Sequence, residues 1–360
     1  MSLLRCACVH DTTSTYLEIL KMKKTLVAIA ALATVGAAFA QSSVMLYGRI
    51  DASIGSQRTT NNGNVAGATV DAGPQVLAGA HTGNRWGMKG SEDLGGGLKA
   101  NFQLESGFNV DTGSSAQGGL LFGRQAWVGL SGGFGALQVG RQYTVIDNMW
   151  TAHDTFALTG YSAAVYAFNK GGYADSSRQN NAVYYTTPSF GGFKAGALWA
   201  PGENKTPGVG AGRMTGLEAS FASGPLTVGG AWESTKVTGA TPATTAWELG
   251  TSYDLGVAKL FGQIEGSKVK ATNSKDDGYQ IGAQIPLGTP SLSVSYAREN
   301  NKLGGTKVST ASAYSLMAQY PLSKRTYVYA AYLNGEIDPV AAGVATQKNR
   351  NFGLGLVHNF

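Results

Sequence analysis

The stretch Leu98-Lys-Ala-Asn-Phe-Gln-Leu-Glu105 alternates apolar and polar side chains one residue at a time. In an extended chain, Ala100, Phe102 and Leu104 share one face, and the polar residues between them share the other. A period of two residues is the pattern of a β-strand whose two faces meet different surroundings. The stretch therefore predicts a strand with one apolar and one polar face.

The same alternation recurs along the chain from Ser43 onward. It is clear in Leu217–Phe221, Trp247–Tyr253, Tyr279–Ile285 and Phe352–Phe360. Seven short connections separate such segments, within 94–98, 131–135, 189–192, 223–225, 254–256, 286–290 and 321–324. Eight longer polar stretches lie between them, near 57–81, 110–119, 144–177, 201–212, 237–244, 269–277, 300–308 and 337–346.

Fifteen connections join sixteen strands and place both ends of the chain on the side of the short connections. This is the organisation of a bacterial outer-membrane barrel, with short periplasmic turns and longer outside loops. Lipid offers no hydrogen-bond partner to an open strand edge, so such a sheet must close on itself. We expect an all-β fold, a sixteen-stranded antiparallel transmembrane β-barrel with a lumen wide enough for water. The alternative is a soluble β-sandwich, although sandwiches typically use about seven to nine strands in ~100 residues.

The N-terminal part of the chain does not share this pattern. Residues 22–40 combine a basic start, a short apolar core and an Ala-Phe-Ala cleavage site, as a secretory signal peptide does. We interpret residues 1–21 as the product of a start codon chosen too far upstream; a genuine extension is the alternative. The mature barrel domain is then 41–360, beginning near Gln41, and it lacks both cysteines of the sequence. A disulfide framework and a thiolate metal site are thereby excluded from it.

Composition argues against several classes of function. Residues 41–360 carry 24 Lys and Arg against 20 Asp and Glu, an excess too small to indicate nucleic-acid binding. The three histidines of this domain, His81, His153 and His358, lack metal-ligand spacing, and the sequence contains no nucleophile or phosphate-binding motif. We therefore expect neither an enzyme nor a bound cofactor or metal.

The connection at 144–177 is longer than the others. It lies between Gly140-Arg-Gln-Tyr143 and Arg178, and it is rich in aromatic residues, glycine, serine and asparagine. Connections of this length in compact proteins are uncommon and are usually functional or disordered. We expect this third long loop to fold into the barrel and to narrow its channel. Its acidic residues are Asp147, Asp154 and Asp175.

Basic residues within strands indicate the lining of the channel. Trp86 and Met88 share one face of an extended chain, while Arg85 and Lys89 share the other. A basic side chain facing lipid near the membrane midplane costs about 2–4 kcal/mol, so Arg85 and Lys89 are expected to face the lumen. Arg49 opposes an isoleucine in its own segment and is expected to face water as well.

Six stretches carry a resemblance to a known family. They are Val44–Asp51, Arg85–Lys99, Gly140–Tyr143, Asn181–Phe193, Leu322–Thr326 and the terminal Phe360. Together they resemble the general trimeric porins of Gram-negative outer membranes, particularly the beta-proteobacterial branch. The resemblance covers the whole of 41–360 and implies a homotrimer in outer-membrane lipid and lipopolysaccharide, with the third long loop of each barrel folded into its pore. Phe360 is similar to the family's signal for insertion by the barrel-assembly machinery.

The resemblance also implies a pore constriction with an arginine wall opposite the loop. Matched residue by residue, this wall is Arg85 in the second strand, Arg124 in the fourth and Arg178 at the start of the sixth. Many members of the family carry an acidic tip in the third loop. This sequence has only its scattered acids there, and which of them faces the arginines stays open.

These patterns favour a water-filled channel of the cell outer membrane through which small hydrophilic solutes and ions diffuse passively. Rings of charged side chains set the ion preference of pores, and arginine stays charged at any relevant pH. The wall arginines, helped by Arg49 and Lys89, should outweigh the loop acids and give mild anion selectivity. Alternatives are a substrate-specific channel for small organic anions or phosphate, arginines that are paired and electrically quiet, a surface barrel closed by its loops, and a secreted soluble protein.

Overall fold

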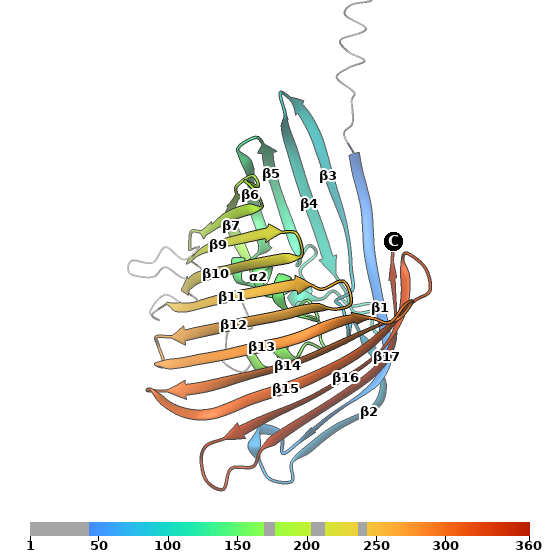
Figure 1. Ribbon diagram of the computed structural model, residues 1–360, viewed down its shortest axis with the longest axis vertical. Helices are drawn as coiled ribbons and strands as arrows, with labels where there is room; N and C mark the ends of the chain where they lie inside the picture. Colours follow the sequence, from blue (N-terminus) through green and yellow to red (C-terminus); the bar gives the residue numbers. More distant parts are fainter. Residues whose placement is uncertain (1–42, 169–176, 203–212, 237–242) are drawn as a thin grey trace, which may run out of the picture. The chain divides into compact units, whose positions relative to one another are not determined.

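The computed structural model describes residues 43–168, 177–202, 213–236 and 243–360. The predicted signal peptide, the segment before it and Asp175 lie outside these residues. Seventeen strands make up most of the described chain (Figure 1). They are β1 (Ser43–Thr60), β2 (Thr69–Ala78), β3 (Arg85–Gly95), β4 (Leu98–Gly107), β5 (Gln125–Gly132), β6 (Gly135–Tyr143), β7 (Arg178–Thr186), β8 (Phe193–Ala200), β9 (Arg213–Ser223), β10 (Leu226–Lys236), β11 (Thr244–Asp254), β12 (Lys259–Val269), β13 (Ser274–Pro286), β14 (Ser291–Leu303), β15 (Thr306–Pro321), β16 (Thr326–Pro339) and β17 (Gln347–Asn359). Two helices, α2 (Val145–His153) and α3 (Ala163–Phe168), and two short 3-10 turns, η1 (Asn62–Asn64) and η2 (Gln117–Gly119), accompany them.

The strands form one antiparallel sheet that closes into a ring. β1 pairs with β17 from Arg49 opposite Asn359 to Thr60 opposite Lys348. On its other side, β1 pairs with both β2 and β3. β2 and β3 therefore share one position in the ring, interrupted at 79–84, so that seventeen strand segments form a barrel of sixteen positions. The predicted sixteen-stranded antiparallel barrel is confirmed.

The short connections are tight turns between neighbouring strands, as predicted. Between β3 and β4, Gly96 and Gly97 have φ angles of 60° and 80°. Positive φ at both central residues is what the commonest two-residue hairpin turns require, and glycine adopts it without strain. This turn therefore depends on the glycine pair that the sequence places there.

Three of the predicted long loops are shorter than expected. The stretch predicted near 57–81 contains the end of β1 and the whole of β2, so only 61–68 and 79–84 lie outside strands there. Near 269–277, β12 continues to Val269 and β13 already begins at Ser274. Near 300–308, only Gly304 and Gly305 separate β14 from β15. At these strand ends both faces carry polar residues, so the alternation that predicts a strand is absent. The backbone hydrogen bonds between the strands continue there all the same. The predicted extent of these loops was wrong, but the order of connections was right.

The two faces of the sheet have opposite character. Trp232 and Trp247 are 41% and 42% exposed, whereas the neighbouring Glu233 and Glu248 are 0% and 2% exposed. This reverses the usual arrangement of a soluble protein, in which apolar side chains are buried and carboxylates are exposed. It is the arrangement of a barrel with an apolar outer surface and a polar inner one.

Both helices belong to the connection between β6 and β7. α2 begins after Thr144, whose hydroxyl oxygen accepts a hydrogen bond from the backbone N–H of Asp147 at 3.2 Å. It packs against β8–β12, and α3 packs against β13–β16, with Ile146 and Phe168 fully buried. The loop thus covers the face of the sheet that carries the buried polar side chains. No described helix is long and apolar enough to cross a membrane.

Glycines in the wall leave room for aromatic side chains of the loop. A Cβ at Gly335 of β16 would lie 2.3 Å from the ring of Tyr166. A Cβ at Gly353 of β17 would lie 2.2 Å from the hydroxyl of Tyr161. Atoms cannot approach so closely, so these positions must lack a side chain for the loop to lie where it does.

Candidate functional site

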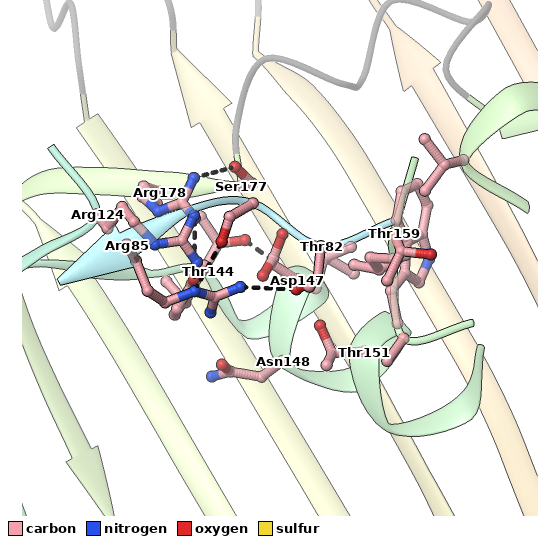
Figure 2. A pocket seen from close by; sticks show the side chains of 17 residues that line it. Thr82, Arg85, Arg124, Thr144, Asp147, Asn148, Thr151, Thr159, Ser177 and Arg178 are labelled. Atoms are coloured by element: carbon pink, nitrogen blue, oxygen red, sulfur yellow. Dashed lines mark hydrogen bonds between the residues drawn. The ribbon is translucent and has the colours of Figure 1, made fainter. Parts of the chain in front are cut away.

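The three predicted wall arginines lie together. Arg85 opens β3, Arg124 immediately precedes β5, and Arg178 opens β7. Their side chains line a pocket of about 510 Å³, to which α2 contributes Asp147 and Asn148 (Figure 2). Residues that are far apart in the sequence therefore converge on one space, with basic groups from the wall and an acid from the loop.

Arg124 is paired with a buried carboxylate. Its Nε donates to Oε1 of Glu105 on β4 at 2.7 Å, and the two side chains are only 8% and 6% exposed. The other carboxylate oxygen of Glu105 accepts a hydrogen bond from the hydroxyl of Tyr47 at 2.9 Å. The charge of Arg124 is therefore compensated where it stands, and the pair contributes little net field to the pocket.

Tyr143, the last residue of β6, joins two of the arginines. Its hydroxyl oxygen accepts a hydrogen bond from Nη2 of Arg124 at 2.7 Å and another from Nη2 of Arg178 at 2.8 Å. The guanidinium carbon of Arg178 also lies 4.4 Å from the centre of the Tyr143 ring, within the range of a cation–π contact. Tyr143 therefore fixes the orientation of Arg178 without neutralising its charge.

Arg85 is positioned through Thr82. The hydroxyl oxygen of Thr82 accepts one hydrogen bond from Arg85 Nη2 and one from Arg49 Nη1, each at 3.0 Å. Thr82 is held in turn by Asp51, whose Oδ2 accepts from the backbone N–H groups of Thr82 and His81 at 2.7 and 2.8 Å. The segment between β2 and β3 thus holds the side chains of Arg49 and Arg85 in place through Thr82.

Four of the basic residues singled out from the sequence have no carboxylate within ion-pair distance among the described residues: Arg49, Lys89, Arg85 and Arg178. Lys89 is exposed, and its ammonium group lies 5.3 Å from the centre of the Tyr47 ring. Because Arg124 is compensated, the net positive charge at the pocket comes from Arg85 and Arg178.

The loop acids lie in different places. Asp147 lines the pocket; burial raises its pKa from 3.8 to about 6, and the positive charges of Arg178 and Arg124 limit that rise. Asp154 does not line the pocket, because its Oδ2 accepts a hydrogen bond from the backbone N–H of Leu158 at 2.7 Å and its side chain is buried within the loop. Asp175 lies outside the described residues.

Sequence reasoning missed the residues that organise this cluster: Thr82, Glu105, Tyr143 and Arg141. Nε of Arg141 donates to the carbonyl of Gly123 at 2.8 Å, one residue before Arg124. Tyr143 and Arg141 belong to a quoted motif, and the parity of Glu105 put it on the polar face. Their contacts depend on strand register, which alternation alone does not reveal.

Comparison with known proteins gives a consistent result. A family model described as Gram-negative porin matches residues 25–338. Outer membrane porin protein 32 of Delftia acidovorans is 36% identical over 324 residues, covering 86% of this chain and 88% of that protein. An outer membrane porin protein of Bordetella pertussis is 33% identical, covering 94% of this chain and 100% of that protein. The solved structure of an anion-selective porin from Comamonas acidovorans aligns with a TM-score of 0.76 at 30% identity, covering 89% of this chain and 100% of that one.

Proposed function

The chain belongs to the Gram-negative porin family, and from this premise we propose that Arg85 and Arg178 set the ion preference of its channel. It is an outer-membrane porin, a β-barrel that lets small hydrophilic solutes and ions pass. The observation that carries the proposal is the pocket lined by both guanidinium groups, which lack a carboxylate partner among the described residues.

The segment Val145–Phe168 forms the opposite side of the constriction. Support for this role comes from the packing of α2 and α3 against the polar face of the sheet, and from the presence of Asp147 in the same pocket as the arginines. A solute passing here meets two fixed positive charges on the wall and one weak acid on the loop. Charged groups lining the narrowest part of a pore govern which ions pass.

Wild-type channels are expected to prefer chloride to potassium. In water, a fixed unit charge about 7 Å from the ion path contributes ~0.6 kcal/mol before salt screening, so two such charges give a preference of roughly twofold to tenfold. The aligned Comamonas porin, which is described as anion-selective, agrees with this sign. The measurement is the reversal potential of purified protein in planar bilayers across a KCl gradient. A reversal potential of cation-selective sign contradicts the proposal.

Anion preference is expected to increase as the pH falls from about 7.5 to about 5. Asp147 has a pKa of about 6, so it is ionised above that pH and neutral below it, whereas the arginines stay charged. Losing one negative charge should raise the chloride-to-potassium ratio about twofold to threefold. Asp147→Asn should show the higher ratio at both pH values. If this variant responds to pH as the wild type does, another group is responsible.

A substrate-specific channel for small organic anions or phosphate is the second candidate. The favourable observation is that guanidinium groups, whose forks of N–H donors match carboxylate and phosphate oxygens, line one pocket with Thr82 and Tyr143. A specific channel should show saturable block of chloride conductance by one such solute. A general pore should show only weak and similar effects from all of them.

Membership of the porin family also suggests how the protein is exported, inserted and assembled. We propose export by the signal peptide at 22–40, insertion by the barrel-assembly machinery, and a homotrimer embedded in outer-membrane lipid and lipopolysaccharide. Support for a role of Phe360 comes from its place at the seam of the ring, where its backbone exchanges hydrogen bonds with Gly48 of β1 at 3.0 and 3.1 Å. Conductance that rises in steps of three supports the trimer.

A further inference from the structure

Four glutamates lie on the inner face of the sheet between β10 and β14, behind the loop. They are Glu233 on β10, Glu248 on β11, Glu265 on β12 and Glu299 on β14, with exposures of 0%, 2%, 4% and 1%. Their chain neighbours on the other face include exposed apolar residues, such as Ile264 at 46%. The wall therefore carries a row of carboxyl groups on the side of the sheet that would otherwise meet water in the lumen.

The loop covers this row at its first two positions through direct contacts. A carboxylate oxygen of Glu233 accepts a hydrogen bond from the backbone N–H of Ile146, at the positive N-terminal end of α2, at 3.4 Å. At the other end of this helix, Nδ1 of His153 lies 2.8 Å from Oε1 of Glu248, and both side chains are buried. α2 thus brings one partner to each of two wall glutamates.

α3 covers the other two positions by packing. It lies against β13, β14 and β15, and Phe168 at its end is 1% exposed. A Cβ at Gly278 of β13 would lie 2.8 Å both from Oε1 of Glu265 and from the Phe168 ring, so the carboxyl group and the ring border the same small space above Gly278. Gly278 is also the residue opposite Glu299 in the β13–β14 ladder.

We propose that the segment Val145–Phe168 shields this row of wall glutamates from the ion path, so that the loop maintains anion preference by covering negative charge. Exposed to water, the four carboxyl groups would ionise and outnumber Arg85 and Arg178, the two pocket arginines that have no carboxylate partner among the described residues. When the loop covers the row, Glu233 and Glu248 have partners on α2. Exclusion of water disfavours the charged form of a buried carboxyl group that has no such partner. The proposal rests on the channel function proposed above.

Removing the loop distinguishes this idea from the simpler view that the loop acts through its own acids. If Asp147 and Asp154 are what matters, a channel without Val145–Phe168 should prefer anions more strongly. If the loop is a shield, the same channel should lose its anion preference, because the wall glutamates become part of the lumen. The two views therefore predict opposite shifts in reversal potential.

The experiment replaces Val145–Phe168 by a Gly-Ser-Gly-Ser linker in the full chain and measures reversal potentials in a KCl gradient. We expect the chloride-to-potassium ratio to fall at least about tenfold, to the side of cation preference, because the deletion exposes four glutamates while removing the negative charge of Asp147. Adding the four Glu→Gln substitutions at 233, 248, 265 and 299 to this variant should restore anion preference. A loop-less channel as anion-selective as the wild type, or more so, overturns the proposal.

A second measurement does not depend on the folding of the loop-less chain. Intact wild-type protein is treated with a water-soluble carbodiimide and glycine ethyl ester, and modified carboxyl groups are located by peptide mass spectrometry. The four wall glutamates should remain unmodified while the exposed Glu92 and Asp254 react. Modification of the row at the rate of Glu92 overturns the shield. Wild-type channels that are not anion-selective would instead refute the function proposed above.

Discussion

Replacing Arg85 and Arg178 together by glutamine is expected to remove most of the anion preference of the channel. These two side chains line the pocket without a carboxylate partner among the described residues, so each contributes its full charge to the ion path. At ~0.6 kcal/mol for each charge, the chloride-to-potassium ratio should fall to within about twofold of unity. Reversal potentials in a KCl gradient measure this directly, and single-channel conductance shows whether the pore is still open.

The matched control is the double substitution Arg124→Gln with Glu105→Gln. It also removes an arginine from the same pocket, but it removes the buried carboxylate that compensates it, so the net charge is unchanged. Arg124→Gln alone is unsuitable, because leaving Glu105 buried without its partner costs about 3–5 kcal/mol. The control should keep the wild-type ratio to within about twofold. Equal loss in both double variants would show that the number of arginines, and not their net charge, sets selectivity.

The difference between Arg124, which has a carboxylate partner, and Arg178, which has none among the described residues, could not be predicted from the sequence alone. The period-two alternation and the lengths of the connections were sufficient for the barrel, because lipid on one side and water on the other impose that pattern on every strand. The energetic cost of a charge in lipid was sufficient to predict that Arg85 faces the lumen. Neither argument distinguishes Arg124 from Arg178, because the partner of Arg124 lies on another strand and its contact depends on register.

The loop could be recognised by its length but not by its structure. Its helices are short, and α3 in particular is a run of small and aromatic residues whose helical form depends on packing against β14 and β15. The wall glutamates were equally hidden, since a carboxylate on the polar face of a strand looks like any residue that faces water. Only the structure of the loop shows that these carboxylates are buried away from water.

Replacing Asp51 by alanine should strongly lower the stability of the barrel. Asp51 is 0% exposed and accepts three hydrogen bonds, from the backbone N–H groups of His81 and Thr82 and from the Tyr329 hydroxyl at 2.9 Å. Each buried donor left without an acceptor costs about 1–3 kcal/mol, so the barrel should lose roughly 3 kcal/mol or more. The measurement is the free energy of unfolding in urea, followed by tryptophan fluorescence in detergent or lipid.

Two control variants sharpen the result for Asp51. Asp51→Asn keeps an oxygen for the two backbone donors, and the Tyr329 hydroxyl can turn to accept from the new amide, so its loss should be smaller. Asp71→Ala removes an exposed carboxylate whose pair with Arg58 spans 3.7 Å and should cost less than about 1 kcal/mol. Because Thr82 holds both Arg49 and Arg85, Asp51→Ala should also weaken anion preference in the channels that still form. An alanine variant as stable and as selective as the wild type would show that the interruption between β2 and β3 positions these arginines without its carboxylate.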